Sequence, residues 1–216
     1  MAPGADRERS APLVFGTGLS RTGTRSAYVE LRRLGFDAVH YPYDAATERE
    51  LFGGAPLSIL GSSDAILDLP AAGFYRQLDE LYPGSRFLHT TRERSEWLGA
   101  VERHYDSLLA GWPSRPRRFQ EFGERITRHV YGAFPFDRDA FAAAYDRHEE
   151  GIAAHFADRP GDLLRLDLTR DADSGRIARF LDLPHADPQR CAHITDADEL
   201  PDDESERTRL RESVLL

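Results

Sequence analysis

Short apolar runs alternate along the chain with longer segments in which apolar residues recur every three or four positions. The runs predict strands at residues 14–15, 36–40, 64–68, 86–91 and 161–168. The longer segments predict helices at 26–34, 44–52, 72–81, 93–109 and 174–181. Strands that alternate with helices are typical of a parallel sheet covered on both faces. We therefore expect an α/β fold, a three-layer sandwich with a central parallel sheet.

The alternation is interrupted between about residues 112 and 157. Two helices are predicted there, at 117–130 and 138–157, with no strand between them, so we expect a helical insertion before the last strand. The second helix carries Phe141, Tyr145 and Phe156 on one face, and such a stripe indicates core packing rather than a cofactor contact. With 216 residues, the chain is expected to form one domain, residues 1–216, with an acidic tail from about residue 185.

Composition and charge narrow the range of partners. The net charge of -9 argues against nucleic acid, whose phosphates are bound through basic surfaces. No apolar run approaches the ~20 residues that cross a membrane, and residues 1–12 lack the apolar core of a secretion signal, so we expect a cytoplasmic protein with no membrane partner. A single cysteine, Cys191, excludes an internal disulfide and a cysteine-based metal site. All 28 basic residues are arginine, so a cation that contacts a bound anion is a guanidinium.

The segment between the first predicted strand and the first predicted helix holds most of the candidate chemistry. A loop that leads from a strand into a helix directs unpaired backbone N–H groups and the positive end of the helix dipole at one point. Hydroxyl groups and two guanidinium groups are added here, so the segment predicts a binding site for phosphate or sulfate. The candidate residues are Ser20, Arg21, Thr22, Gly23, Thr24, Arg25 and Ser26.

The spacing of this loop differs from two common glycine-rich loops. The dinucleotide fingerprint needs a glycine where Arg21 stands, and the nucleoside-triphosphate loop needs Gly-Lys-Ser/Thr where Gly23-Thr24-Arg25 stands. Neither NAD nor ATP is therefore supported. A purely structural strand-to-helix turn also favours glycine and hydroxyl residues, but it gives no reason for Arg21 among them.

Further polar residues follow the other predicted strands. Open parallel sheets bind ligands beyond the carboxyl ends of their strands, where His40, Asp68 and Arg92 are expected. Each has an alternative: Asp68 as a helix cap, His40 as a packed histidine, and Arg92 in an ion pair with Glu93 or Glu96. His89 is expected to be packed inside its strand. His148 and His155 share a helix face without suitable acidic neighbours, so no metal site is expected.

Three segments in this order resemble a known family. They are the loop 18–26, the strand end 64–70, and the strand 86–91 with Arg92 and Trp97 behind it. They resemble bacterial sulfotransferase-like proteins of the P-loop superfamily, as does the segment from Tyr131 to Leu164, so that the resemblance spans residues 12–184. It implies the version of the three-layer fold that P-loop NTPases share.

The resemblance also implies an enzyme. It would move a sulfuryl group from 3′-phosphoadenosine 5′-phosphosulfate (PAPS) to a hydroxyl or amine of a small-molecule acceptor, by in-line transfer without a metal. Residues 20–26 would hold the 5′-phosphosulfate, with Arg21 also catalytic, and Arg92 would hold the 3′-phosphate. Asp68 precedes Leu-Pro where many relatives have a catalytic histidine, which makes it the candidate for the general base, with His40 as the alternative.

One position departs from the family pattern. Relatives usually have a serine eight residues after the arginine of the 3′-phosphate site, and this chain has Ala100. The loss of one hydroxyl weakens binding by roughly 1–3 kcal/mol unless Ser95, Arg94 or Arg25 replaces it. Two alternatives stay open: a phosphotransferase that uses a nucleoside triphosphate, and a non-catalytic protein that binds an anion or nucleotide. Aromatic residues of the insertion predict an apolar or aromatic acceptor, namely Trp112, Phe119, Phe122, Phe134 and Phe136.

Overall fold

A computed structural model describes residues 11–170 and 175–183, and its strands form one parallel sheet. The strands are β1 (Val14–Gly16), β2 (Ala38–His40), β3 (Ala65–Leu67), β4 (Arg86–Thr90) and β5 (Leu163–Leu166), in the order β2-β3-β1-β4-β5. All five predicted strands are confirmed, and the last four are shorter than predicted. After β1, the chain forms β2 and β3 on one side of β1, and it later forms β4 and β5 on the other side of β1. The loop after β1 therefore lies at the point where ligands bind in such sheets.

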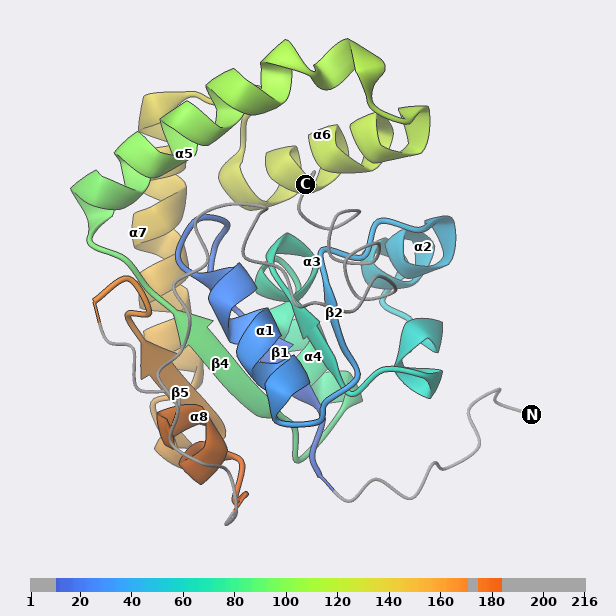
Figure 1. Ribbon diagram of the computed structural model, residues 1–216, viewed down its shortest axis with the longest axis vertical. Helices are drawn as coiled ribbons and strands as arrows, with labels where there is room; N and C mark the ends of the chain where they lie inside the picture. The colour runs from blue at the N-terminus through green and yellow to red at the C-terminus, as the bar shows by residue number, and fades with distance from the viewer. Residues whose placement is uncertain (1–10, 171–174, 184–216) are drawn as a thin grey trace.

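Helices cover both faces of the sheet (Figure 1). Helix α1 (Thr24–Arg33) and helix α8 (Gly175–Phe180) lie on one face, while α3 (Leu69–Ala72), α4 (Tyr75–Leu81) and α7 (Arg138–His155) lie on the other. Successive strand residues alternate between the two cores: Val14 and Leu88 pack with α1, whereas Phe15 and Phe87 pack with the opposite helices. The expected three-layer α/β sandwich is confirmed.

The helix predicted at 72–81 is divided into α3 and α4. Asp68 caps α3 through a hydrogen bond from the Leu69 amide, and Pro70 occupies the first turn, so the helix begins three residues early. The break falls at Gly73, where a Cβ atom would lie 2.9 Å from a methyl of Val130. Close packing of a later helix at this glycine, which a local pattern does not reveal, explains the difference.

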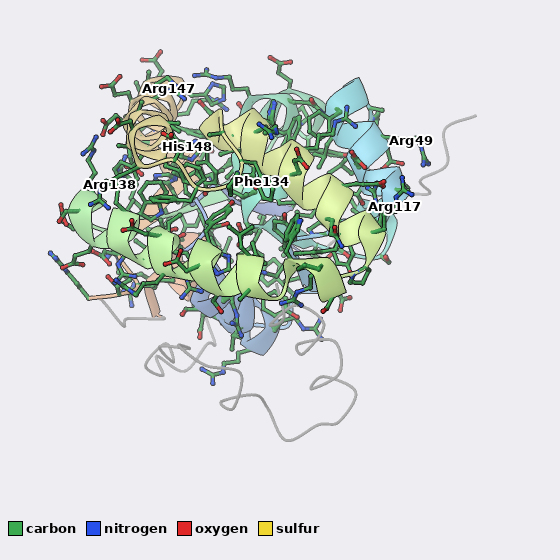
Figure 2. The ribbon with its side chains drawn as sticks, turned by 90° about the horizontal axis from the view of Figure 1, so that it is seen from above. Arg49, Arg117, Phe134, Arg138, Arg147 and His148 are labelled. Carbon is green, nitrogen blue, oxygen red and sulfur yellow. The ribbon has the colours of Figure 1, made fainter. Side chains whose placement is uncertain are left out.

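The predicted helical insertion before β5 is confirmed. Helix α6 (Arg117–Tyr131) follows α5 (Arg94–Ala110), and seen from above the two cross the carboxyl edge of the sheet with Phe134 between them (Figure 2). Helix α7 then packs along the sheet, with the side chains of Phe141, Tyr145 and Phe156 buried as predicted. The remaining elements are α2 (Ala45–Gly53) and the short 3-10 helices η1 (Ser58–Gly61), η2 (Trp112–Ser114) and η3 (Pro160–Asp162).

The acidic tail predicted from about residue 185 lies outside the described residues, and the division of the chain into a single domain stays a prediction. Within residues 11–170 and 175–183, no helix combines the length and the apolar character that crossing a membrane requires.

Candidate active site

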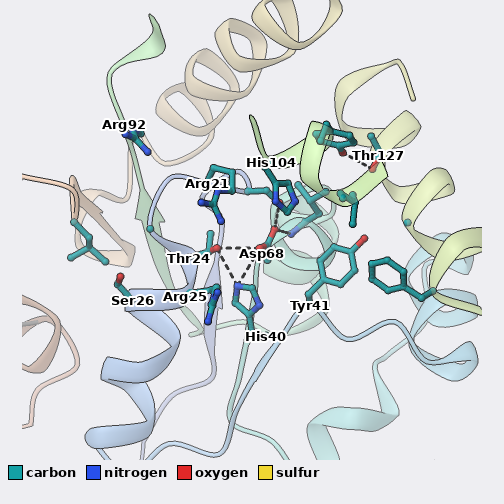
Figure 3. A pocket seen from close by; sticks show the side chains of 18 of the residues that line it. Arg21, Thr24, Arg25, Ser26, His40, Tyr41, Asp68, Arg92, His104 and Thr127 are labelled. Atoms are coloured by element: carbon teal, nitrogen blue, oxygen red, sulfur yellow. Dashed lines mark hydrogen bonds and ion pairs between the residues drawn. The ribbon is translucent and has the colours of Figure 1, made fainter. Parts of the chain in front are cut away.

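A cavity of about 260 Å³ opens at the carboxyl edge of the sheet, between the loop after β1 and the helices α5 and α6 (Figure 3). One wall, which we call the arginine side, consists of Ser20, Arg21, Gly23, Thr24, Arg25, Ser26, Arg92, Leu168 and Thr169. The opposite wall, the aromatic side, consists of Tyr41, Tyr105, Leu108, Trp112, Phe119 and Phe134. His40, Asp68, His104 and Thr127 lie between the two walls. The cavity therefore brings together all but one of the predicted site residues.

The exception is Thr22, which does not line the cavity. Its side chain is buried, and its hydroxyl donates to the Leu19 carbonyl at 2.7 Å and lies 2.7 Å from the Thr90 hydroxyl. The loop packs so tightly here that a Cβ atom on Gly18 would lie 1.9 Å from the Thr90 oxygen. Thr22 thus fixes the loop to the end of β4, and its hydroxyl faces the protein rather than the cavity.

The loop itself has the backbone of an anion cradle. Arg21 and Gly23 have positive φ angles of 71° and 105°, and α1 begins at Thr24. The amide of Ala27 is the first to bond back along the helix, to the Gly23 carbonyl at 3.1 Å, as expected for the first turn of a helix. The indole N–H of Trp97 donates to the Ser20 carbonyl at 2.9 Å and holds the loop from behind. The amides of the first turn and the guanidinium of Arg21 therefore belong to one wall of the cavity.

Asp68 has the most constrained conformation in the site. Its backbone has φ 73° and ψ −164°, a region that residues other than glycine rarely adopt and that costs about 1–3 kcal/mol. Its Oδ1 accepts from the Ser20 hydroxyl at 2.5 Å and the Leu69 amide at 2.7 Å. Its Oδ2 accepts from the Thr24 hydroxyl at 3.1 Å and lies 3.1 Å from His40 Nε2. The carboxylate thus ties the end of β3 to the loop and to β2.

These contacts determine the charge of Asp68. Burial alone would raise its pKa, but the hydrogen bond and charge of His40, together with bonds from Ser20 and the Leu69 amide, outweigh burial and lower the pKa below its usual value. Asp68 is therefore ionised at neutral pH, and four donors occupy the roughly four acceptor positions of a carboxylate. Of the two readings of the sequence, the helix cap is confirmed; the role of general base stays a prediction.

His40 lies beneath Asp68 and is buried. Its Nε2 lies 3.1 Å from both the Thr24 hydroxyl and Asp68 Oδ2, and because a carboxylate only accepts, this nitrogen carries a proton. Its Nδ1 is buried and has no hydrogen-bond partner among the described residues. His40 is thus both a packed strand-end histidine and a member of the Asp68 network.

Arg92 lies on the arginine side, just beyond β4. The predicted ion pair with Glu96 is loose, with 3.8 Å between Arg92 Nε and the nearer carboxylate oxygen, and Nε is buried without a hydrogen-bond partner in the described part of the chain. A buried donor of this kind needs an acceptor. The Tyr145 hydroxyl fixes the backbone here by donating to the Arg92 carbonyl at 2.6 Å.

The structure also places the residues proposed to replace the missing serine. Ala100 is buried in α5 and does not line the cavity. The hydroxyl of Ser95 donates to Glu93 at 2.6 Å, and Arg94 pairs with Asp146 at 2.7 Å, so both are engaged elsewhere. Of the three candidates, Arg25 alone lines the cavity.

The aromatic side matches part of the prediction. Trp112, Phe119 and Phe134 line the cavity, with ring centroids of Trp112 5.7 Å from Phe119 and 5.0 Å from Phe134. Phe122 and Phe136 belong to the core cluster instead. Sequence reasoning missed His104, Tyr105, Tyr41, Thr127, Leu168 and Thr169. His104 and Tyr105 continue the apolar stripe of α5. Such a stripe predicts that this side of the helix is buried, but not which part of the protein covers it.

The remaining histidines have structural partners. His89 is fully buried, with Nδ1 3.1 Å from the Thr17 hydroxyl and Nε2 2.9 Å from Glu149, so the predicted packing is confirmed. His148 Nε2 donates to the Thr17 carbonyl at 2.7 Å, and His155 pairs with Asp79 at 2.8 Å. Among the described residues, no group of three or more histidine, cysteine or acidic side chains is arranged to hold a metal.

The fold and the cavity define a class of protein, an α/β protein with a cavity beside the loop that follows the central strand of a parallel sheet. The chain belongs to the sulfotransferase domain family, whose sequence model matches residues 13–200. It is also similar to Ava biosynthesis cluster protein M of Aspergillus versicolor, with 31% identity over 119 residues, which are 47% of this chain and 45% of that protein. The chain thus spans less than half the length of this curated relative. The family implies sulfuryl transfer and confirms the resemblance, while its restriction to bacterial members is not tested by these matches.

Proposed function

We propose that the chain is a PAPS-dependent sulfotransferase that acts on a small acceptor with an apolar or aromatic body. The observation that carries the proposal is one cavity with two unlike walls. The arginine side offers guanidinium groups and the first turn of α1, which suit the phosphates and the sulfuryl group of the donor. The aromatic side offers ring faces, which suit a carbon skeleton.

The residues present fit the donor at two points. The loop from Ser20 to Ser26 would hold the 5′-phosphosulfate, with Thr22 contributing its backbone position rather than its hydroxyl. Arg92 lines the cavity, and its guanidinium would contact the 3′-phosphate, while Arg25 is the cavity residue that can supply the contact missing at Ala100. These assignments stay proposals.

The proposed chemistry depends most on Arg21. In sulfuryl transfer, negative charge develops on the oxygen that bridges sulfur and the 5′-phosphate. A fixed guanidinium and backbone amides at that position stabilise the transition state without reorganising, which is the most effective form of electrostatic catalysis. Asp68 holds the Ser20 and Thr24 side chains of the same loop in place.

The position of His40 disfavours the phosphotransferase alternative. Enzymes with a nucleoside-triphosphate loop hold Mg²⁺ between the loop Ser/Thr and an acidic residue at a strand end. Here Arg25 stands at the position of that loop Ser/Thr and Thr24 at the position of the loop lysine, so the hydroxyl that would hold the metal is absent from its place. Thr24 does donate a hydrogen bond to Asp68, but the protonated Nε2 of His40 lies 3.1 Å from both of them. A hydrogen-bond donor of the chain itself therefore takes the position between hydroxyl and carboxylate, in keeping with metal-independent transfer.

The proposal is tested by calorimetric titration with adenosine 3′,5′-bisphosphate, the product that PAPS leaves, in buffer with EDTA. Saturable binding that does not depend on Mg²⁺, with ATP much weaker, is expected. Tight binding of ATP only in the presence of Mg²⁺ would favour the phosphotransferase. Bisphosphate binding without turnover of PAPS, across phenol, alcohol and amine acceptors, would favour a non-catalytic binding protein.

A further inference from the structure

Asp68 and His40, the two candidates for the general base, already make hydrogen bonds within the protein. Both oxygens of Asp68 accept hydrogen bonds, and the cavity-facing nitrogen of His40 is protonated and directed at Asp68. The other nitrogen of His40 is buried, out of reach of a molecule in the cavity. To accept a proton from an acceptor, either residue would first have to give up a bond that holds the oxyanion loop.

His104 is placed differently. It projects from α5 into the cavity between the two walls, and Figure 3 shows its imidazole above Asp68 and beside Arg21. The side chain is half-buried, and within the residues that the structure describes neither of its ring nitrogens makes a hydrogen bond. It is thus a cavity imidazole whose lone pair is not engaged by another part of the described chain.

We infer that His104 is the catalytic base, which accepts the proton of the acceptor as the sulfuryl group is transferred. The inference rests on the proposed function. In this step the acceptor oxygen forms a bond to sulfur while the bond from sulfur to the bridging oxygen breaks. Both electrons of the broken bond stay on the phosphate of the departing bisphosphate, and the acceptor proton moves to the free nitrogen of His104 and from there to water.

The surroundings keep His104 neutral and ready to accept. Burial disfavours the imidazolium, and the charges of Arg21 and Arg115 add to this effect against a smaller opposing effect of Asp68, so the pKa of His104 is lowered to about 4. These are the charged groups that face the ring from the loop, from β3 and from the start of the insertion. Because a bound anion offsets the charge of Arg21, occupation of the arginine side raises the pKa of His104 towards neutrality and strengthens it as a base.

The first experiment needs no acceptor. The C–H resonances of His104, assigned by their loss in His104→Gln, are followed by NMR from pH 3 to 8 with and without adenosine 3′,5′-bisphosphate. We expect a rise in pKa of one unit or more when the bisphosphate binds, and in Arg21→Ala a higher starting value with a smaller rise. A pKa that is the same with and without the bisphosphate would overturn the inference.

The second experiment measures turnover as release of bisphosphate from PAPS, with 2-naphthol or water as the nucleophile. General-base catalysis is worth about 10²–10⁴-fold, so His104→Ala should lower kcat by that factor and leave the bisphosphate affinity within about threefold. Added imidazole should restore part of the loss by entering the space left by the ring. The matched control is His129→Gln, a histidine of α6 that lies outside the cavity and packs on Phe74, which should leave kcat unchanged.

The outcomes separate the two claims. If the wild-type protein binds bisphosphate and turns over PAPS but His104→Ala keeps kcat within threefold, or loses it without rescue by imidazole, His104 is not the base and the proposed function stands. If the wild-type protein binds no bisphosphate, the proposed function and the inference fail together. A merely structural role would lower the melting temperature of His104→Ala, and imidazole would not restore its activity.

Discussion

The two walls of the cavity are built in different ways. Most of the arginine side comes from one continuous segment, residues 20–26, to which Arg92, Leu168 and Thr169 are added. The shape of this segment follows from backbone conformation, with positive φ at Arg21 and Gly23 and the start of a helix at Thr24. The aromatic side comes from Tyr41 just after β2, from α5, η2 and α6, and from the segment after α6, and its shape follows from how rings pack across a long insertion. Under the proposed function, the donor site therefore depends mainly on local backbone conformation, whereas the acceptor site depends on packing between distant segments.

Removal of the Arg21 guanidinium from the arginine side should have the largest effect. Arg21→Ala should lower kcat for PAPS turnover by about 10²–10³-fold, because a fixed donor at the developing charge is lost, with a smaller loss of bisphosphate affinity. Steady-state kinetics with 2-naphthol measures the first quantity and calorimetry the second. Arg147→Ala, at an exposed arginine of α7, is the control and should match the wild type. Equal turnover of Arg21→Ala and wild type would refute the role assigned to the loop.

Arg92 should separate binding from chemistry on the same wall. Charge-assisted hydrogen bonds are worth about 1.5–3 kcal/mol, so Arg92→Ala should weaken bisphosphate binding by about 10–100-fold while kcat at saturating PAPS changes little. The comparison with 5′-AMP sharpens the test, because the ligand without a 3′-phosphate should bind both proteins equally. A loss that is the same for both ligands would place Arg92 outside the 3′-phosphate site.

His148 holds the start of the loop on the arginine side, and its contribution to the stability of the protein should depend on pH. His148 donates to the Thr17 carbonyl at the start of the loop, and burial together with the neighbouring His89 lowers its pKa to about 4. An unfolded histidine has a pKa of about 6.5, so between these values the unfolded chain binds a proton that the folded chain does not. The contribution of His148 to the free energy of unfolding is therefore complete above about pH 6.5. It falls as the pH drops towards 4, by about 1.4 kcal/mol per pH unit.

Denaturant unfolding of wild type and His148→Gln across this range measures that contribution. The glutamine amide can still donate to Thr17 but does not titrate, so the difference in stability between the two proteins should shift in favour of His148→Gln as the pH falls. A difference that stays constant from pH 7 to pH 4 would show that His148 is already charged in the folded protein.

The smallest effect is expected on the aromatic side. Trp112 contacts the rings of Phe119 and Phe134 on this wall, so Trp112→Ala should raise the KM for 2-naphthol by about tenfold, in line with about 1–3 kcal/mol for an apolar contact in a pocket. Bisphosphate affinity should stay within twofold of the wild type. If Trp112→Ala instead weakened bisphosphate binding, the two walls would not be independent.

The difference between the two walls also explains which parts of the fold and the site could be predicted from the sequence. The succession of strands and helices along the chain, the loop after β1 and the strand-end positions of His40, Asp68 and Arg92 follow from local patterns, since a strand, a tight loop and a helix are read from neighbouring residues. The burial of the Thr22 hydroxyl depends on contact with Thr90, far along the chain, and so escapes a local pattern.

The residues of the aromatic side could not all be predicted from local patterns, because they also depend on contacts between distant segments. Trp112 and Phe119 reach the cavity while Phe122 is fully buried in the core, although all three occupy similar sequence surroundings. His104 becomes a site residue because α5 crosses the edge of the sheet beside Arg21, and no spacing within α5 predicts that crossing.

A crystal structure of the full chain with adenosine 3′,5′-bisphosphate would test most directly whether the loop after β1 and Arg92 bind the donor. We predict the 5′-phosphate against the amides of residues 22–26 and the Arg21 guanidinium, the 3′-phosphate within hydrogen-bond distance of the Arg92 guanidinium, and open space between the 5′-phosphate and Trp112. A bisphosphate bound elsewhere, or a 5′-phosphate that makes no contact with Arg21, would contradict the proposed donor site.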